Sequence, residues 1–367
     1  MRGLALLLLL ALLLPPGALA LEQGEIWEEQ ARSYGLEELE RAGEEYLGEI
    51  DLADGMDVPS ILNALGQRGR EGITGVVKGS VRSCVLLLVI TLLCGLAETM
   101  GAGSGGDPLK TATLAAALAI TAVAVGDVHS LLSMGEEAID QMQSLGDVLL
   151  PAVSMTTAAS GAPAAAAVKY SITILFSDFL IRLIRRLLIP LCYTFVAVNV
   201  AWAALGNDGL KRMGGLLKWM ITIILSVVLL IFIGYLNLSG VISGSADAAT
   251  IKAAKFTISN MVPVVGGVIS DTAETLLAGA SLLRNTAGVF GMLAVLAICL
   301  APFLHLGLHY ILYKITAALA ATVSGDGRVT GLIESLGSAF GLILAMTGSC
   351  GVLLIVAMTS AVSVVAG

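Results

Sequence analysis

Two histidines in the apolar half of the sequence have the spacing of metal ligands. His305 and His309 are four residues apart, so one face of a helix would carry both imidazoles, as in zinc-binding helices. A zinc site needs three or four ligands, and the nearby Cys299 would lie on a different turn and face of that helix. We therefore expect these histidines to make polar contacts between helices, and we predict no metal site.

Two aspartates could form the acid pair of an intramembrane protease. Asp178 and Asp271 are each a single carboxylate near the end of a helical segment, and such a group is usually hydrated or paired. Asp178 also precedes Arg182 by four residues, which places the two charges on one helical face and predicts an intramembrane ion pair. The alternative of an aspartyl enzyme stays open, but we assign no catalytic residue.

Sequence motifs of other enzymes are missing from the chain. It contains no G-x-S-x-G, no GxxxxGK[ST] phosphate loop and no H-E-x-x-H. The five cysteines stand singly in apolar segments, without a CxxC pair, and are expected to be buried free thiols. We therefore predict a non-enzymatic protein without a cofactor.

The elements that must position these residues are membrane-spanning helices. Hydrophobic residues make up 57% of the chain and charged residues only 13%, about half the share usual in soluble domains. Apolar runs near the ~20 residues that cross a bilayer recur from residue 80 onward. The sequence predicts an all-α, polytopic membrane protein with about seven transmembrane helices, within a range of five to eight. The predicted spans are 81–97, 109–126, 160–181, 187–205, 216–236, 287–313 and 337–365.

The N-terminus has the three parts of a signal peptide, which we assign to residues 1–20. Arg2 gives a positive start, Leu4 to Leu14 is an apolar run, and Ala18 and Ala20 supply the small residues before a cleavage site. We predict cleavage at the end of this segment, with an uncleaved anchor as the alternative.

A small acidic head follows over residues 21–77. Between residues 21 and 75, fourteen carboxylates stand against four arginines, so this segment holds the excess negative charge of a chain with net charge −8. Scattered leucines and isoleucines predict short amphipathic helices, and the targeting segment before them predicts that they lie outside the cytoplasm. The membrane domain, residues 78–367, is nearly neutral and offers no basic surface for nucleic acid.

Two basic clusters conflict with a simple path of the chain. Arg182 and Arg185 end one predicted span, and Lys211 follows one predicted span later. A single crossing cannot place both clusters in the cytoplasm, where Lys and Arg are enriched. Pro190 and Asn199, which lie between the clusters, indicate a kinked or re-entrant path as one solution.

The amphiphilic segment 237–286 is predicted to contain a broken helix. Pro263 and the pair Gly266 and Gly267 should interrupt the helix, and two half-helices meeting there would expose backbone groups that suit a pore or substrate path. An interfacial amphipathic hairpin is the alternative. The candidate pathway or assembly residues are Lys252, Lys255, Asn260, Pro263, Gly266, Gly267, Asp271 and Asn285.

Three motifs stand in this part of the chain: the run K-x-x-K-F-x-I-S-N from Lys252, the turn P-V-V-G-G-V-x-S-D from Pro263, and the stretch A-S-L-L-x-N that ends at Asn285. In these motifs the chain resembles the stage III sporulation protein AE family of endospore-forming bacteria. The order of signal peptide, polar head and several spans extends the resemblance over most of the chain.

The resemblance implies a multi-pass membrane subunit of the channel-like apparatus that links mother cell and forespore, needed for late forespore development. It implies that the protein lies in the mother-cell membrane around the forespore. The implied partners are other membrane proteins of that sporulation channel complex and a separate ATPase subunit. No catalytic residues are established for that family, so the resemblance assigns none to this chain. An autonomous small-molecule transporter and an intramembrane aspartyl enzyme remain the alternatives.

Overall fold

The computed structural model describes residues 33, 35–48, 57–101, 108–261, 266–323 and 327–362, and all regular structure in these ranges is helical. Its elements are α3 (Leu36–Leu47), α4 (Val58–Gly101), α5 (Pro108–Ala159), α6 (Pro163–Leu183), the π-helical turn η1 (Ile184–Leu188), α7 (Ile189–Leu205), α8 (Asp208–Met261), α9 (Gly266–Ala320) and α10 (Gly327–Val362). The predicted all-α class is confirmed, while the predicted signal peptide lies outside the described residues.

Six helices in the described part of the chain are long and apolar enough to cross a membrane. They cover Val58–Ala97, Thr113–Ala159, Pro163–Leu205, Asp208–Leu236, Gly279–Ala320 and Gly327–Val362. A polytopic helical membrane protein is therefore confirmed, and the number of spans lies within the predicted range. It is one fewer than seven because the predicted spans 160–181 and 187–205 belong to one continuous helical rod.

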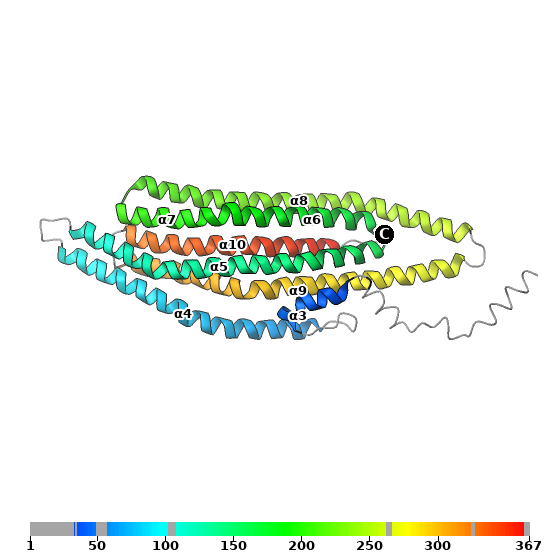
Figure 1. Ribbon diagram of the computed structural model, residues 1–367, viewed down its shortest axis with the longest axis horizontal. Coiled ribbons are helices and arrows are strands. Elements are labelled where there is room, and N and C mark those ends of the chain that lie inside the picture. Colours follow the sequence, from blue (N-terminus) through cyan, green and yellow to red (C-terminus); the bar gives the residue numbers. More distant parts are fainter. Residues whose placement is uncertain are drawn as a thin grey trace, which may run out of the picture.

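The rod Pro163–Leu205 has its irregular point at η1, between α6 and α7. Pro190 is the second residue of α7 and cannot donate to the carbonyl four residues earlier, which lies within η1. A π-helical turn absorbs this missing bond and bends a helix without ending it. The re-entrant path considered for residues 187–205 is wrong, because α6 and α7 continue in the same direction along the bundle (Figure 1).

The long helices lie side by side in one elongated bundle (Figure 1). At one end of the bundle, which we call the hairpin end, α7 turns into α8 and α9 turns into α10. The head end is the opposite end, where α5 turns into α6 and where α3 lies. Gly206 closes α7 with a φ of 69°, and Gly161 has a φ of 96° in the turn before α6. Glycine adopts this left-handed backbone without strain, which explains a tight turn at each place.

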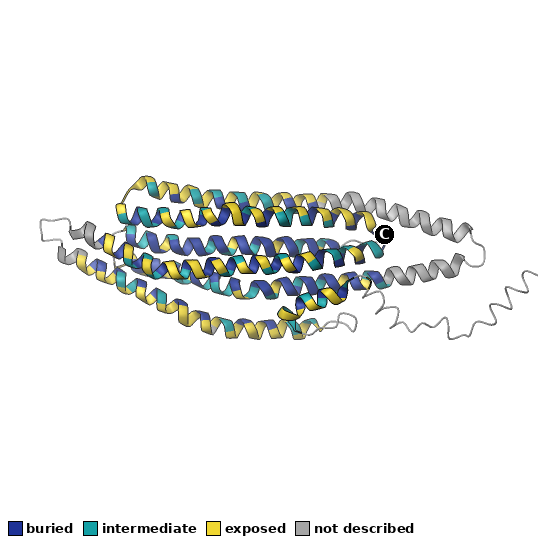
Figure 2. Cartoon of the chain, viewed as in Figure 1, coloured by how far each residue is buried: buried dark blue, intermediate teal, exposed yellow. Residues whose placement is uncertain are grey.

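Helices α9 and α10 form the buried centre of the bundle (Figure 2). In the most apolar stretch of each span, 61% of the α10 residues and 56% of the α9 residues are buried, against 22% for α8. Tyr313 of α9 packs edge-on against Phe340 of α10, with ring centroids 4.9 Å apart. The outer helix α8 exposes large apolar side chains such as Trp219 and Leu230, as expected of a surface that faces lipid.

Two glycines of α10 allow α9 to approach closely. A Cβ at Gly337 would lie 3.0 Å from the Cβ of Tyr313, and a Cβ at Gly341 would lie 3.0 Å from the ring of Tyr310. Small residues spaced in this way favour close helix packing in membranes. The α9–α10 pair is therefore held by backbone proximity as well as by its aromatic side chains.

The acidic head is packed onto the bundle. Leu36 and Leu39 of α3 are buried in the common core, and Gly43 faces the ring of Phe290 on α9. Arg68 of α4 donates a 2.6 Å hydrogen bond to the backbone carbonyl of Tyr46. The first part of α4 belongs to the predicted head and continues without interruption into the predicted span 81–97. The described part of the head therefore shares its core with the spans.

Candidate functional site

A polar cavity of about 550 Å³ lies near the hairpin end, between α7, α8, α9 and α10. Its volume falls within the range of small-molecule sites. The polar lining residues are Asn199 from α7, Lys211 and Lys218 from α8, Lys314 from α9, and Thr330, Glu334, Ser335 and Ser338 from α10. Two pairs of consecutive helices, α7 with α8 and α9 with α10, therefore supply one polar surface in an apolar bundle, and the side chains of Lys211, Lys218 and Glu334 are exposed.

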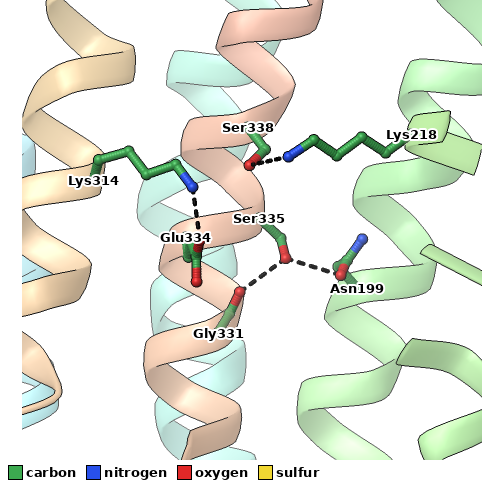
Figure 3. Close-up of polar contacts among 7 residues, drawn as sticks. All are labelled: Asn199, Lys218, Lys314, Gly331, Glu334, Ser335 and Ser338. Carbon is green, nitrogen blue, oxygen red and sulfur yellow. Dashed lines mark hydrogen bonds and ion pairs between the residues drawn. The ribbon is translucent and has the colours of Figure 1, made fainter. Parts of the chain in front are cut away.

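Two lysines reach toward α10 from opposite sides (Figure 3). Lys314 Nζ donates to Glu334 Oε1 at 2.7 Å, and Lys218 Nζ donates to Ser338 Oγ at 3.3 Å. An ammonium group has three N–H donors, and each of these bonds uses one of them. Both lysines can therefore bind a further acceptor without giving up their present contact.

Asn199 is fixed between α7 and α10. The side chain is 5% exposed, its Nδ2 donates to the Phe195 carbonyl at 2.7 Å, and its Oδ1 accepts from Ser335 Oγ at 2.9 Å. The Ser335 hydroxyl also lies 2.8 Å from the Gly331 carbonyl (Figure 3). A buried amide whose nitrogen and oxygen are both hydrogen-bonded adds rigidity to this wall of the cavity.

Trp202 forms an aromatic part of the wall. The ammonium group of Lys211 lies 4.9 Å from the centroid of the Trp202 ring, within the range of a cation–π contact. Gly331 leaves room for this ring, since a Cβ there would lie 2.6 Å from it. The glycine on α10 therefore helps to set the position of the tryptophan, and through it that of the lysine.

The cavity carries positive charge and lacks the groups of a hydrolytic centre. Three lysines and one glutamate give the lining a formal charge of +2. Its described lining contains no pair of carboxylates and no nucleophile beside a histidine base, the arrangements that general acid–base or covalent catalysis uses. The geometry therefore suits the binding of an anion.

A second cavity, of about 540 Å³, lies between α5, α7 and α10. Valines, alanines and Leu336 dominate its lining, with His129, Tyr193 and Thr121 as its polar members. It offers a hydrophobic surface with few polar anchors, so the lysine-lined cavity is the better candidate for specific recognition.

His309 makes the interhelical contact that the sequence predicts. The Ser80 hydroxyl lies 3.2 Å from its Nδ1 and 3.1 Å from its Nε2, which joins α4 to α9. His305 instead lies with its Nδ1 2.9 Å from the Ala301 carbonyl of its own helix. Across the described ranges, no three His, Cys, Asp or Glu residues come together as a metal site would require.

The predicted pair of Asp178 and Arg182 is present as an ion pair. Arg182 Nε donates to Asp178 Oδ1 at 2.9 Å, and the side chains of Asp178 and Arg182 are 47% and 68% exposed. An aspartyl enzyme needs two carboxylates side by side that share a proton, whereas the neighbour of Asp178 is an arginine. This contact weakens the case for Asp178 as half of an aspartyl pair.

The segment that the sequence singled out lies apart from the cavity. Helix α8 ends at Met261 and α9 begins at Gly266, and the residues between them, where a break is predicted, lie outside the described part of the chain. The last turns of α8 contain Lys252, Lys255 and Asn260, and the first turns of α9 contain Gly266, Gly267 and Asp271. Asn285 is exposed further along α9, and Pro263 lies outside the described residues. None of these residues lines the described cavity, and their pathway or assembly role stays a prediction.

Sequence reasoning missed the cavity. One signal in the sequence could have predicted the cavity: three charged residues, Lys218, Lys314 and Glu334, stand within otherwise apolar helices. Charged residues in membrane helices usually serve a function or pair with one another. Their meeting could not be foreseen, since Lys218 and its partner Ser338 are 120 residues apart in the sequence.

The bundle defines a multi-pass helical membrane protein, and sequence comparison identifies the family. The profile of the family described as "Stage III sporulation protein AE" matches residues 55–366. The chain belongs to this family, which confirms the predicted resemblance and a role in sporulation.

A relative from Bacillus subtilis (strain 168) is named "Stage III sporulation protein AE". It is 24% identical to this chain over 245 residues, which cover 66% of this chain and 61% of the relative. The chain thus spans less than two thirds of that relative's length in the comparison. No solved structure matches the chain.

Proposed function

We propose that this protein is a non-enzymatic, multi-pass subunit of a membrane complex that forms a channel between mother cell and forespore. In this proposal it resides in the mother-cell membrane around the forespore and is needed for late forespore development. The observation that carries the proposal is the family match over residues 55–366, combined with six apolar helices long enough to span a bilayer.

The lengths of the helices support a role in an assembly. The elements α4, α5, α8 and α9 have 44, 52, 54 and 55 residues, whereas about 20 residues suffice to cross a bilayer. The bundle must therefore extend well beyond the hydrocarbon core. An extension of this kind offers a surface on which other subunits can dock.

The proposed partners are other membrane proteins of the same sporulation complex and a separate ATPase subunit, with the lipid bilayer as the medium. The chain has no GxxxxGK[ST] phosphate loop, so energy from nucleotide hydrolysis would have to come from another protein. Nucleic acid is not among the proposed partners.

The proposal is tested by an in-frame deletion of the gene in the spore-forming host. We expect development to stop after engulfment, with loss of heat-resistant spores and of late forespore gene expression, and we expect the intact gene to restore both. Normal spore yield in the deletion strain would contradict the proposal.

The lysine-lined cavity favours one second candidate, an autonomous small-molecule transporter. A cavity of about 550 Å³ between membrane helices has the volume of a small-molecule site. The purified protein alone, reconstituted in liposomes, would then move a small anion down its gradient. Flux equal to that of empty liposomes would exclude this candidate and leave the subunit proposal standing.

A further inference from the structure

The charged residues at the hairpin end indicate which side of the membrane this end faces. Five described basic residues lie in the last turns of α9 or the first turns of α8 and α10, against two described acidic residues in the same turns. The basic residues are Lys211, Arg212, Lys218, Lys314 and Arg328, and the acidic residues are Asp208 and Glu334. Short loops and helix ends rich in Lys and Arg stay in the cytoplasm. The cavity therefore lies toward the cytoplasmic leaflet.

The position and chemistry of the cavity resemble those of a site that binds a phospholipid headgroup. Phe195 and Trp202 provide apolar wall, and the alanines of α9 line another part of the same space. The cationic groups are lysine ammonium ions, which bind phosphate as point charges. Basic pockets between helices at the cytoplasmic side are typical binding places for anionic phospholipid headgroups.

We propose that the cavity lined by Lys211, Lys218 and Lys314 binds a phosphate group, carried either by an anionic phospholipid or by a small soluble phosphate compound. The phosphate oxygens accept hydrogen bonds from Lys218 and Lys211, and the Ser335 and Ser338 hydroxyls lie on the α10 side of the same space. Glu334 opposes the bound anion and is held by Lys314 at 2.7 Å. The proposal does not depend on the channel function, because it concerns binding by the isolated protein.

The two sources of phosphate are separated by a binding measurement on the purified full-length protein in a neutral detergent. Native mass spectrometry would count bound phosphatidylglycerol, with phosphatidylcholine of the same acyl chains as the uncharged comparison. Inorganic pyrophosphate is then added as the soluble competitor. Displacement of phosphatidylglycerol by pyrophosphate assigns a free phosphate compound, and selective lipid binding without displacement assigns a lipid headgroup.

Three variants test the site itself. Lys218→Gln removes one lining charge and should weaken phosphate binding about fivefold, the effect of one lysine near an anionic surface. Arg212→Gln removes one charge from the same helix outside the cavity lining and should leave the affinity within about twofold, because screened charges beyond the site contribute little. Glu334→Gln removes the opposing carboxylate and should tighten binding, a gain that a misfolded variant cannot produce.

Several outcomes would overturn the proposal. Equal binding of phosphatidylglycerol and phosphatidylcholine, with no binding of pyrophosphate, would show that the cavity does not recognise phosphate. Equal losses in Lys218→Gln and Arg212→Gln would place the phosphate elsewhere. Preferential binding of a polyglutamate peptide over both phosphate probes would assign the cavity to an acidic protein segment instead.

Discussion

Arg185, in the π-helical turn η1, forms an ion pair with Asp140 of α5. Arg185 therefore lies midway along the rod of α6 and α7, beside the acidic part of α5. The basic residues around Lys211 lie at the hairpin end. The conflict between the two basic clusters is resolved if Arg185 stays outside the cytoplasm, paired with a carboxylate, and Lys211 stays inside.

This arrangement predicts a topology with the hairpin end in the cytoplasm and the head end outside. Asn63→Cys on α4 and Asp208→Cys at the start of α8 both place a thiol at an exposed position. A membrane-impermeant maleimide should label Asn63→Cys in intact cells, and Asp208→Cys only after the cells are permeabilised. The five native cysteines are buried, so the wild-type chain is the low-background control. The reverse labelling pattern would refute the topology.

The hydrophobic pattern predicted the class of the fold and most of its spans, because long apolar runs leave few alternatives in a bilayer. It did not predict that residues 163–205 form one rod. Alanine, serine and threonine in that region fit a broken helix as well as a packed one, and Pro190 fits either a stop or a π-helical turn. The packing of α6 and α7 along the bundle decides this point, and that packing is a tertiary property.

The candidate site depends even more on tertiary structure. Asn199, Lys218 and Ser335 are ordinary polar residues in three separate apolar segments, and only the crossing of those helices brings them together. The sequence instead drew attention to the segment around Pro263, where a break is predicted and unusual residues are neighbours along the chain. Local sequence shows local irregularity, and it does not show which distant charges meet.

Gly331→Ala should lower the stability of the bundle. The new Cβ would lie 2.6 Å from the Trp202 ring, which is buried and cannot move away freely, so we expect a loss of about 1–3 kcal/mol. Gly66→Ala on α4 is the matched control, because nothing lies within 4 Å of its Cβ position, and it should raise stability by up to about 1 kcal/mol. Thermal unfolding in detergent measures both, and equal midpoints would contradict the close packing of Trp202 on α10.

Tyr313→Phe should destabilise the contact between α5 and α9. The Tyr313 hydroxyl donates a 2.7 Å hydrogen bond to Asp127 Oδ2, and its loss leaves that carboxylate oxygen without this donor. We expect a loss of about 0.5–2 kcal/mol, the range for polar contacts between membrane helices. Tyr235→Phe removes the same hydroxyl from an exposed position on α8 and should change stability little. An equal effect of both variants would argue against a role for this hydrogen bond.

Gly266→Val and Gly267→Val should reduce the yield of heat-resistant spores. Both glycines stand at the start of α9, next to the break that the sequence predicts at Pro263, and a β-branched residue restricts the backbone angles available there. Gly75→Val on α4 is the control, since its Cβ position is open. Protein levels in the membrane fraction must be equal in the three strains. Wild-type spore yield from both α9 variants would remove this segment from the proposed mechanism.

The proposed role as a mother-cell channel subunit is tested most directly by compartment-specific complementation of the deletion strain. The gene is expressed in the mother cell alone or in the forespore alone, and heat-resistant spores are counted after engulfment. We predict that expression in the mother cell restores spore formation and that expression in the forespore does not. Restoration by forespore expression alone, or spore formation without the gene, would contradict this role.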